Sequence, residues 1–100
     1  MDKKEDYTEK QIQIANFAKA MSHPARVFIL QKLSKMNSCC YSGDLVNELP
    51  ISRSALSLHL KELKNAGLIN GHIKAPYIKY CINPDNWEIA KKLCKEMFDE

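Results

Sequence analysis

Glycine, paired cysteines and long apolar runs are scarce in this sequence, and each shortage excludes a class of protein. Three glycines among 100 residues do not supply a glycine-rich phosphate-binding loop. The four cysteines include no C-x-x-C pair, so the spacing of a zinc ribbon is missing. No apolar run approaches the roughly 18 residues of a membrane-spanning helix, and the charged N-terminus lacks the apolar segment of a signal peptide. We therefore expect a cytoplasmic protein with no membrane partner, in which the cysteines are thiols.

Catalytic constellations are missing from the sequence as well. No set of serine, cysteine and histidine residues reads as a triad, so we predict that the protein is not an enzyme and has no catalytic residues. One hundred residues allow one domain at most, which we place over 1–100 with a flexible segment at 1–8. A chain this short buries a modest share of its surface, and it therefore gains stability from a partner subunit.

The net charge of +3 is unevenly distributed along the chain. The segment 51–83 contains five basic side chains and one acidic side chain, which gives it +4. The segment 84–100 contains three lysines and five acids, which gives it −2. Because a basic stripe on one element is the electrostatic pattern of a surface that binds phosphate groups, the middle of the chain is the better candidate for a nucleic-acid contact.

Apolar spacing and helix-capping residues predict two helices at the start of the chain. The first is expected over 9–22, and the second over 24–35. Pro24 suits the first turn of the second helix, where its missing N–H costs nothing. The positions of the second helix expected to face inward are Val27, Leu30 and Leu33.

The next segments predict a strand stub and a short third helix. The stretch 37–42 is irregular and suits a strand stub. Ser42 can cap a helix over 43–50, which Pro50 ends. Ser52 is the expected cap of a fourth helix, and Gly67 stands where a left-handed residue would end it.

The last third of the chain predicts a hairpin and a terminal helix. The stretch 68–83 reads as two strands joined at "KAPY", and 83–98 as a helix that begins near Asn83 or Asp85. The complete order is helix, helix, stub, helix, helix, hairpin, helix. This order predicts a mainly α protein with a small β-hairpin, a winged helix-turn-helix of order α-α-(β)-α-α-β-β-α.

The fourth helix is expected to present two different faces. Steps of about 100° per residue place Leu56, Leu60 and Leu63 on one inward stripe. His59 lies beside this stripe, which favours a packed and hydrogen-bonded histidine over a base contact. The outward face would contain Arg53, Ser54, Ser57, Leu58, Lys61, Lys64 and Asn65.

The chemistry of this outward face suits DNA better than plain solvent, although a solvated face is the alternative. Acidic side chains are nearly absent, and small hydroxyl side chains let the helix backbone approach a surface. The exposed Leu58 needs an apolar partner, for which a thymine methyl group in the major groove is a candidate.

Every residue of the outward face except Asn65 has a predicted role in DNA contact. Arg53 would bond guanine, since a recognition helix reads base edges with its N-terminal residues. Ser54 and Ser57 would donate to phosphates or base edges, and Lys61 and Lys64 would contact phosphates and fix the register. On the hairpin, the corresponding candidates are Lys74 and Lys79.

Two segments resemble the ArsR/SmtB family of metal- and stress-responsive repressors. "SRSALSLHLKELKNAGLI" is similar to the family pattern S-x-S-x-x-S-x-H-L-x-x-L-x-x-A-G-L-V, and "AMSHPARVFILQKL" to its ALxxPxRxxIL segment. The resemblance covers roughly residues 12–98. It implies a transcriptional repressor that binds double-stranded DNA sequence-specifically as a homodimer, on an inverted-repeat operator. A winged helix used only for protein–protein assembly is the alternative.

The terminal helices support the dimer independently of the resemblance. They contain more apolar surface than one small core needs, and the same residues would otherwise complete the monomer core. The candidate dimer residues are Ile12, Ile14, Phe17, Met21, Trp87, Ile89, Ala90, Leu93, Met97 and Phe98.

The family's metal sites are not matched, which leaves the cysteines as candidate sensors. The thiolate box E-L-C-x-C-D-L is replaced by "CYSGDL", and the last helix has no histidine, so no metal ligands are assigned. Cys39, Cys40 and Cys94 are the candidate thiol sensor, through a soft metal or metalloid ligand or through redox and sulfur species. A bond from Cys39 or Cys40 to Cys94 would make a redox switch. The alternative is that Cys81 and Cys94 are small buried hydrophobes.

Overall fold

The computed structural model describes residues 6–35 and 39–99. The expected flexible segment 1–8 falls largely on residues 1–5, which lie outside the described part. Thr8, at the end of this segment, caps the first helix, since its side chain accepts a hydrogen bond from the Gln11 N–H. The elements are α1 (Glu9–Ala20), α2 (Pro24–Ser34), β1 (Cys39–Tyr41), α3 (Ser42–Glu48), α4 (Arg53–Asn65), β2 (Ile69–Lys74), β3 (Tyr77–Ile82) and α5 (Pro84–Phe98).

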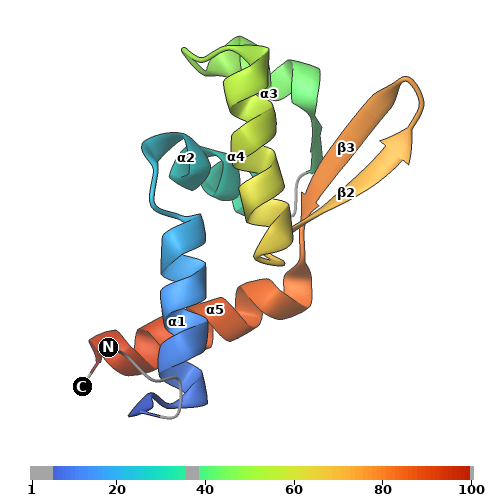
Figure 1. The fold of residues 1–100 in the computed structure, drawn as a ribbon. Coiled ribbons are helices and arrows are strands. Elements are labelled where there is room, and N and C mark those ends of the chain that lie inside the picture. The colour runs from blue at the N-terminus through green and yellow to red at the C-terminus, as the bar shows by residue number, and fades with distance from the viewer. Residues whose placement is uncertain (1–5, 36–38, 100) are drawn as a thin grey trace.

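The elements form two groups along the long axis of the molecule (Figure 1). In the upper group, α2 and α3 flank α4, and the β2–β3 hairpin projects to one side. In the lower group, α1 crosses α5. The terminal helices are therefore set apart from the helix and hairpin predicted to contact DNA.

The sheet has three antiparallel strands in the order β1-β3-β2. The predicted hairpin is confirmed, with Ala75 and Pro76 at its turn. The predicted strand stub is β1, which pairs with β3 so that Cys39 lies opposite Cys81 and Tyr41 opposite Lys79. This pairing links the residue before α3 directly to the hairpin.

The hydrophobic core lies where α2, α3, α4 and the base of the hairpin meet, and it continues to α1 and α5. Phe17, Ala90 and Leu93, which were candidate dimer residues, are buried in this core. The inward stripe of α4 is confirmed, because Leu56, Leu60 and Leu63 are all buried. The prediction for α2 is right for Leu30 and Leu33 but wrong for Val27, which is 40% exposed. Residues three apart on a helix drift by about 60° at each step, so three of them do not share one narrow stripe. The remaining large, fully buried side chains are Ile29, Leu45, Leu68 and Ile69.

Most helix ends follow the capping residues that the sequence indicates. Ser52 caps α4, since its Oγ accepts a hydrogen bond from the Ala55 N–H at 3.2 Å. Gly67 has a φ of +80°, and its carbonyl accepts a hydrogen bond from Asn86 Nδ2 at 2.9 Å. A side chain at this position would meet Asn86, so glycine serves both the turn and the contact with α5.

One cap differs from the prediction, and two others complete it. Ser42 is the first residue of α3 and not its cap, because Tyr41 holds that position without a side-chain hydrogen bond. His23 caps α2, since its Nδ1 accepts from the Ala25 N–H at 3.0 Å. Asn83 caps α5, which settles the start of the last helix. The architecture is a winged helix-turn-helix as predicted, with α3 and α4 as the helix pair and β2–β3 as the wing. Among the described residues, none of the helices is both long and apolar enough to cross a membrane.

Candidate nucleic-acid interface

The outward face of α4 is exposed along its whole length. All seven residues predicted to face outward are exposed, which confirms the orientation of the helix. Leu58 is 56% exposed, whereas Leu60 on the opposite side is 1% exposed. The 13 residues of α4 span about 20 Å, and nothing in the described part of the chain covers this face. The helix is therefore free to enter a groove.

Serine hydroxyls gather at the N-terminal end of α4. The Oγ atoms of Ser52 and Ser54 lie 3.1 Å apart and share a hydrogen bond. Ser52 also caps the helix, which holds its first turn, with Arg53 and Ser54, in a defined place. Small side chains here leave the helix start open to close approach by a polyanion, whose negative charge the helix dipole favours.

The wing contributes its lysines on one face of the sheet. In the hairpin register, Lys79 lies opposite His72, and Lys74 lies opposite Tyr77. Because directly opposed residues share a face and successive residues alternate, the side chains of these residues lie on one face, opposite the one that packs on the core. The structure thus places Lys74 and Lys79 together, on an element separate from α4.

An arginine–histidine cluster fixes the inner side of α4. His59 is buried, as predicted, and its Nδ1 accepts a hydrogen bond from Arg26 Nε at 2.9 Å. The His23 ring lies 4.4 Å from the His59 ring. Burial, with the neighbouring His23 and Arg26 adding to it, lowers the pKa of His59 below its ordinary 6.5. A neutral His59 suits this arrangement, because only the neutral ring accepts a hydrogen bond.

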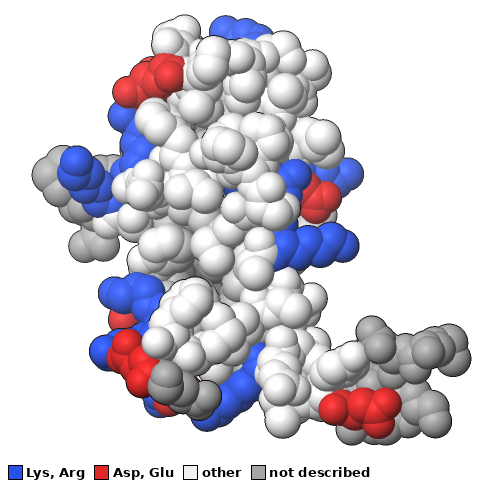
Figure 2. All heavy atoms as spheres, turned by 90° about the vertical axis from the view of Figure 1, so that its left-hand side faces the viewer, with Lys and Arg blue, Asp and Glu red and all other residues white. Residues whose placement is uncertain are grey.

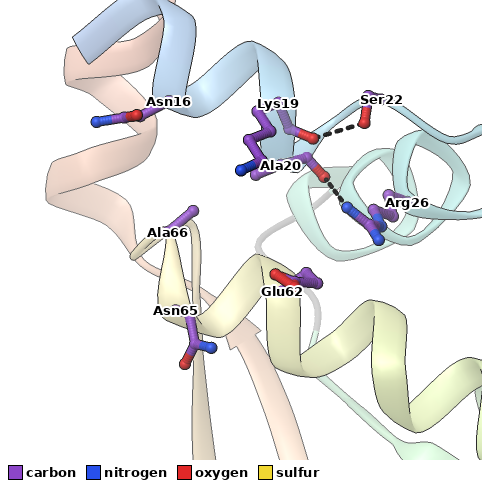
Figure 3. A pocket seen from close by; sticks show the side chains of 8 residues that line it. All are labelled: Asn16, Lys19, Ala20, Ser22, Arg26, Glu62, Asn65 and Ala66. Carbon is purple, nitrogen blue, oxygen red and sulfur yellow. Dashed lines mark hydrogen bonds between the residues drawn. The ribbon is translucent and has the colours of Figure 1, made fainter. Parts of the chain in front are cut away.

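A hollow of about 540 Å³ opens beside this cluster, between the ends of α1 and α4 and the start of α2 (Figure 3). On one side of it, Arg26 Nη1 donates a hydrogen bond to the Ala20 carbonyl at 3.4 Å. Lys19 and Glu62 also line it, on opposite sides. Its lining contains neither a thiol nor an imidazole, so it has no donors for a soft metal ion.

The cysteines are arranged differently from the prediction. Cys39 is disulfide-bonded to Cys81, so the prediction that the cysteines are thiols is wrong for these two, and Cys81 is not a lone buried hydrophobe. The predicted bond from Cys39 or Cys40 to Cys94 is not formed. Cys40 and Cys94 are free. Cys39 and Cys40 are neighbours on a strand and therefore point to opposite faces, which keeps them from binding one ion together. Burial raises the pKa of Cys40, and this favours its thiol over the reactive thiolate.

Metal donors are not clustered in the described part of the chain. No group of three or more histidine, cysteine or acidic side chains there is placed to hold a metal ion. The two histidines that do approach each other, His23 and His59, are engaged in capping α2 and in bonding Arg26.

Three of these contacts join residues that lie far apart in the sequence. Arg26 and His59 are 33 residues apart, and Cys39 and Cys81 are 42 apart. Arg26 and His59 occupy defined positions of the two family-like segments, in P-x-R and in H-L respectively. The presence of both motifs is the only sequence signal that could have pointed to this contact. His23, which appears isolated in the sequence, is brought to His59 by the packing of α2 on α4.

Comparisons with known proteins agree with this architecture. The pattern of the arsR family of bacterial regulatory proteins matches residues 23–71. The HTH-type transcriptional regulator YgaV of Escherichia coli (strain K12) is 40% identical over 70 residues, which cover 70% of each chain. The transcriptional repressor SdpR of Bacillus subtilis is 37% identical over 68 residues, which cover 68% of this chain and 73% of SdpR.

A solved structure extends the similarity over nearly the whole chain. HlyU from Vibrio cholerae superposes with a TM-score of 0.74 at 26% identity, over 94% of this chain and 100% of HlyU. The curated relatives are transcriptional regulators and not enzymes. By its sequence pattern, its relatives and its winged helix-turn-helix fold, this chain belongs to the ArsR family of DNA-binding transcriptional regulators.

Proposed function

We propose that this protein is a sequence-specific transcriptional repressor that acts in the cytoplasm as a homodimer, with residues 1–100 working as one DNA-binding unit. The observation that carries the proposal is the outward face of α4, which is exposed, basic and poor in acids. Arg53 and Leu58 read base edges in the major groove, and Ser54 and Ser57 bond base edges or phosphates.

Phosphate contacts supply most of the binding energy. Lys61 and Lys64 follow the same helix face, and Lys74 and Lys79 on the wing reach the neighbouring backbone or minor groove. These lysines position the protein without reading sequence, because phosphates are identical at every base pair.

The dimer is supported by apolar surface on the terminal helices. Phe98 at the end of α5 is 76% exposed, and Tyr7, Ile89 and Met97 are exposed as well. A hollow of about 450 Å³ lies over α1, lined in part by Tyr7 and Ile12. Figure 2 shows a strip of uncharged surface, with charges of both signs along its edges, that continues down to the level of α1 and α5. A second copy of this chain packs on these helices.

The symmetry of the dimer dictates the operator. Two copies related by a two-fold axis would place their α4 helices about 34 Å apart on one side of the DNA. The operator is then an imperfect inverted repeat whose half-sites are one helical turn apart. The alternative, a winged helix that only assembles with proteins, has no support from relatives that are named as transcriptional regulators.

Selection from a pool of random duplexes, followed by fluorescence anisotropy on the selected duplex, tests the proposal. If about six phosphates are contacted, affinity should fall about 1,000-fold between roughly 50 and 200 mM salt. Lys64→Ala should reduce the salt dependence, whereas Lys92→Ala, which removes the same charge from α5, should not. If no sequence is enriched and no binding is seen at either salt concentration, the repressor proposal is refuted. The alternative of a protein–protein assembly module would then remain.

A further inference from the structure

We infer that Cys39 and Cys81 form a reversible oxidative modification site that fixes the start of the helix-turn-helix to the wing. This inference rests on the proposed DNA-binding function. The two residues are direct register partners in β1 and β3, with their Cα atoms 4.4 Å apart, and their sulfurs are bonded. Directly opposed residues in an antiparallel pair keep their side chains adjacent, so the two thiols remain neighbours when the bond is reduced.

The position of the pair makes it accessible to small oxidants and reductants. Cys39 is exposed and Cys81 half-buried. Both lie on the face of the sheet that carries Lys79, away from the core. Cys40, by contrast, packs against the core, so the reactive member of the adjacent cysteines is Cys39.

The bond connects the wing to the strand that leads into α3, and α3 packs against α4, the helix predicted to contact DNA. β1 has three residues, and α3 begins at the next residue, Ser42. β3 is the strand of the wing that pairs with both β1 and β2. The disulfide therefore anchors the first helix of the helix-turn-helix to the wing. Without it, β1 is an edge strand held by three register pairs, and the two parts have more freedom relative to each other.

This difference in conformational freedom between the oxidised and reduced forms predicts which form binds DNA more tightly. Binding requires α4 and the wing to be fixed in one relative placement, and ordering them costs conformational entropy. The oxidised protein has lost that freedom already, whereas the reduced protein loses it on binding. We expect the oxidised form to bind DNA more tightly, by about fivefold or more, the lower end of typical allosteric coupling.

The modification is a balanced thiol–disulfide exchange with a low-molecular-weight disulfide, RSSR. The Cys39 thiolate attacks one sulfur of RSSR, which forms a mixed disulfide and releases RS⁻. The Cys81 thiolate then attacks Cys39 Sγ, which forms the Cys39–Cys81 bond and releases the second RS⁻. The two protons lost from the cysteines are taken up by the two RS⁻ ions. The cysteines are oxidised by two electrons and RSSR is reduced to two RSH.

The first experiment follows the bond itself and does not depend on DNA. The full-length protein is equilibrated in glutathione buffers of graded redox potential, quenched with an alkylating reagent and mapped by peptide mass spectrometry. We expect a Cys39–Cys81 peptide that forms and disappears across the series, while Cys40 and Cys94 stay alkylated. A pair that stays reduced at every potential, or one that no thiol buffer reduces, would overturn a reversible site.

The second experiment measures DNA affinity for the oxidised and reduced forms, with circular dichroism establishing that both are folded. The duplex is the one selected by the protein itself. Cys39→Ser and Cys81→Ser should each bind like reduced protein and respond to no redox buffer. Cys40→Ser and Cys94→Ser should respond like the original protein.

The outcomes separate this inference from the proposed function. Equal affinity of the two forms for the selected duplex, with a bond that forms and breaks, would overturn the inference and leave the repressor intact. Loss of the redox response in Cys94→Ser would also overturn it, because the bond would then involve α5. No DNA binding in either form refutes the proposed function, and with it the coupling inferred here.

Discussion

The helices α4 and α5 are both amphipathic and both capped, yet they expose different kinds of surface. On α4, Leu58 is the one large apolar side chain left outside, among hydroxyls and lysines. On α5, Ile89, Met97 and Phe98 remain exposed. The polar face of α5 also contains ion pairs, such as Lys95 with Asp99 at 2.7 Å, whereas α4 has no ion pair among the described residues.

The difference indicates two kinds of partner. A face with cationic and hydroxyl groups and almost no acid suits a polyanion that is itself hydrated. A face whose charges already form ion pairs with each other, and whose apolar side chains remain exposed, suits another protein surface. Burial of the apolar side chains would supply the binding free energy, and the paired charges would need no partner across the interface. We therefore propose DNA as the partner of α4 and a second protomer as the partner of α5.

Truncating Leu60 and Leu58, a buried and an exposed leucine of α4, should give the largest difference in stability between two variants. Leu60→Ala removes a fully buried side chain and should lower the free energy of unfolding by about 2–5 kcal/mol. Leu58→Ala should change stability by about 0.5 kcal/mol or less and lower DNA affinity instead. Urea unfolding and anisotropy measure the two effects, and equal losses of stability would show that Leu58 is packed in solution.

The second largest effect should come from placing a charge on α5, which should weaken the dimer. Phe98→Glu should raise the dissociation constant of the dimer by about thirtyfold or more, equivalent to about 2 kcal/mol for a central apolar contact. Ile73→Glu on the wing, where the original side chain is also exposed, is the matched control. Sedimentation velocity over a concentration series checks both variants. A dimer that survives Phe98→Glu, or is lost in Ile73→Glu, would place the interface elsewhere.

The smallest predicted effect comes from the buried histidine behind α4. Because burial lowers the pKa of His59 below 6.5, the unfolded chain takes up a proton at a higher pH than the folded protein does. The contribution of His59 to stability is therefore fully present above about pH 6.5 and is lost as the pH falls through the lowered folded value. Urea unfolding at about pH 7.5 and 5.5 should show this loss.

Two asparagine variants identify the histidine responsible. His59→Asn retains an acceptor for Arg26 without titrating, so its stability should depend less on pH. His72→Asn, at an exposed position on the wing, should behave like the original protein. An unchanged pH dependence in His59→Asn would assign the effect to another group.

Local patterns were sufficient to predict the elements and the orientation of α4. The apolar period from Leu56 to Leu63, the cap at Ser52 and the glycine at 67 all lie within one short stretch and agree with one another. The hairpin could be predicted in the same way, since two strand-like stretches lie on either side of a turn sequence. The residues that determine each of these features lie within a few positions of one another in the sequence.

Contacts between distant segments were not predictable in the same way. The Cys39–Cys81 bond depends on the register of β1 against β3, which no feature near Cys39 specifies. Helix geometry alone shows that Val27, Leu30 and Leu33 do not share one narrow stripe, but which of them is exposed depends on how α4 and β3 pack against α2. The proposed dimer contacts and the proposed base contacts of Arg53 are harder still to predict, because they involve a second protomer and DNA, which are not part of this chain.

Base preference at each position of the operator is the most direct measure of whether α4 lies in the major groove. Duplexes selected by the original protein, by Arg53→Ala and by Lys64→Ala are sequenced and compared. Arg53→Ala should lose preference at one base pair in each half-site, worth about 1–3 kcal/mol, whereas Lys64→Ala should weaken all duplexes about equally. Identical preferences in all three proteins, with affinity lost uniformly, would contradict base reading by this helix.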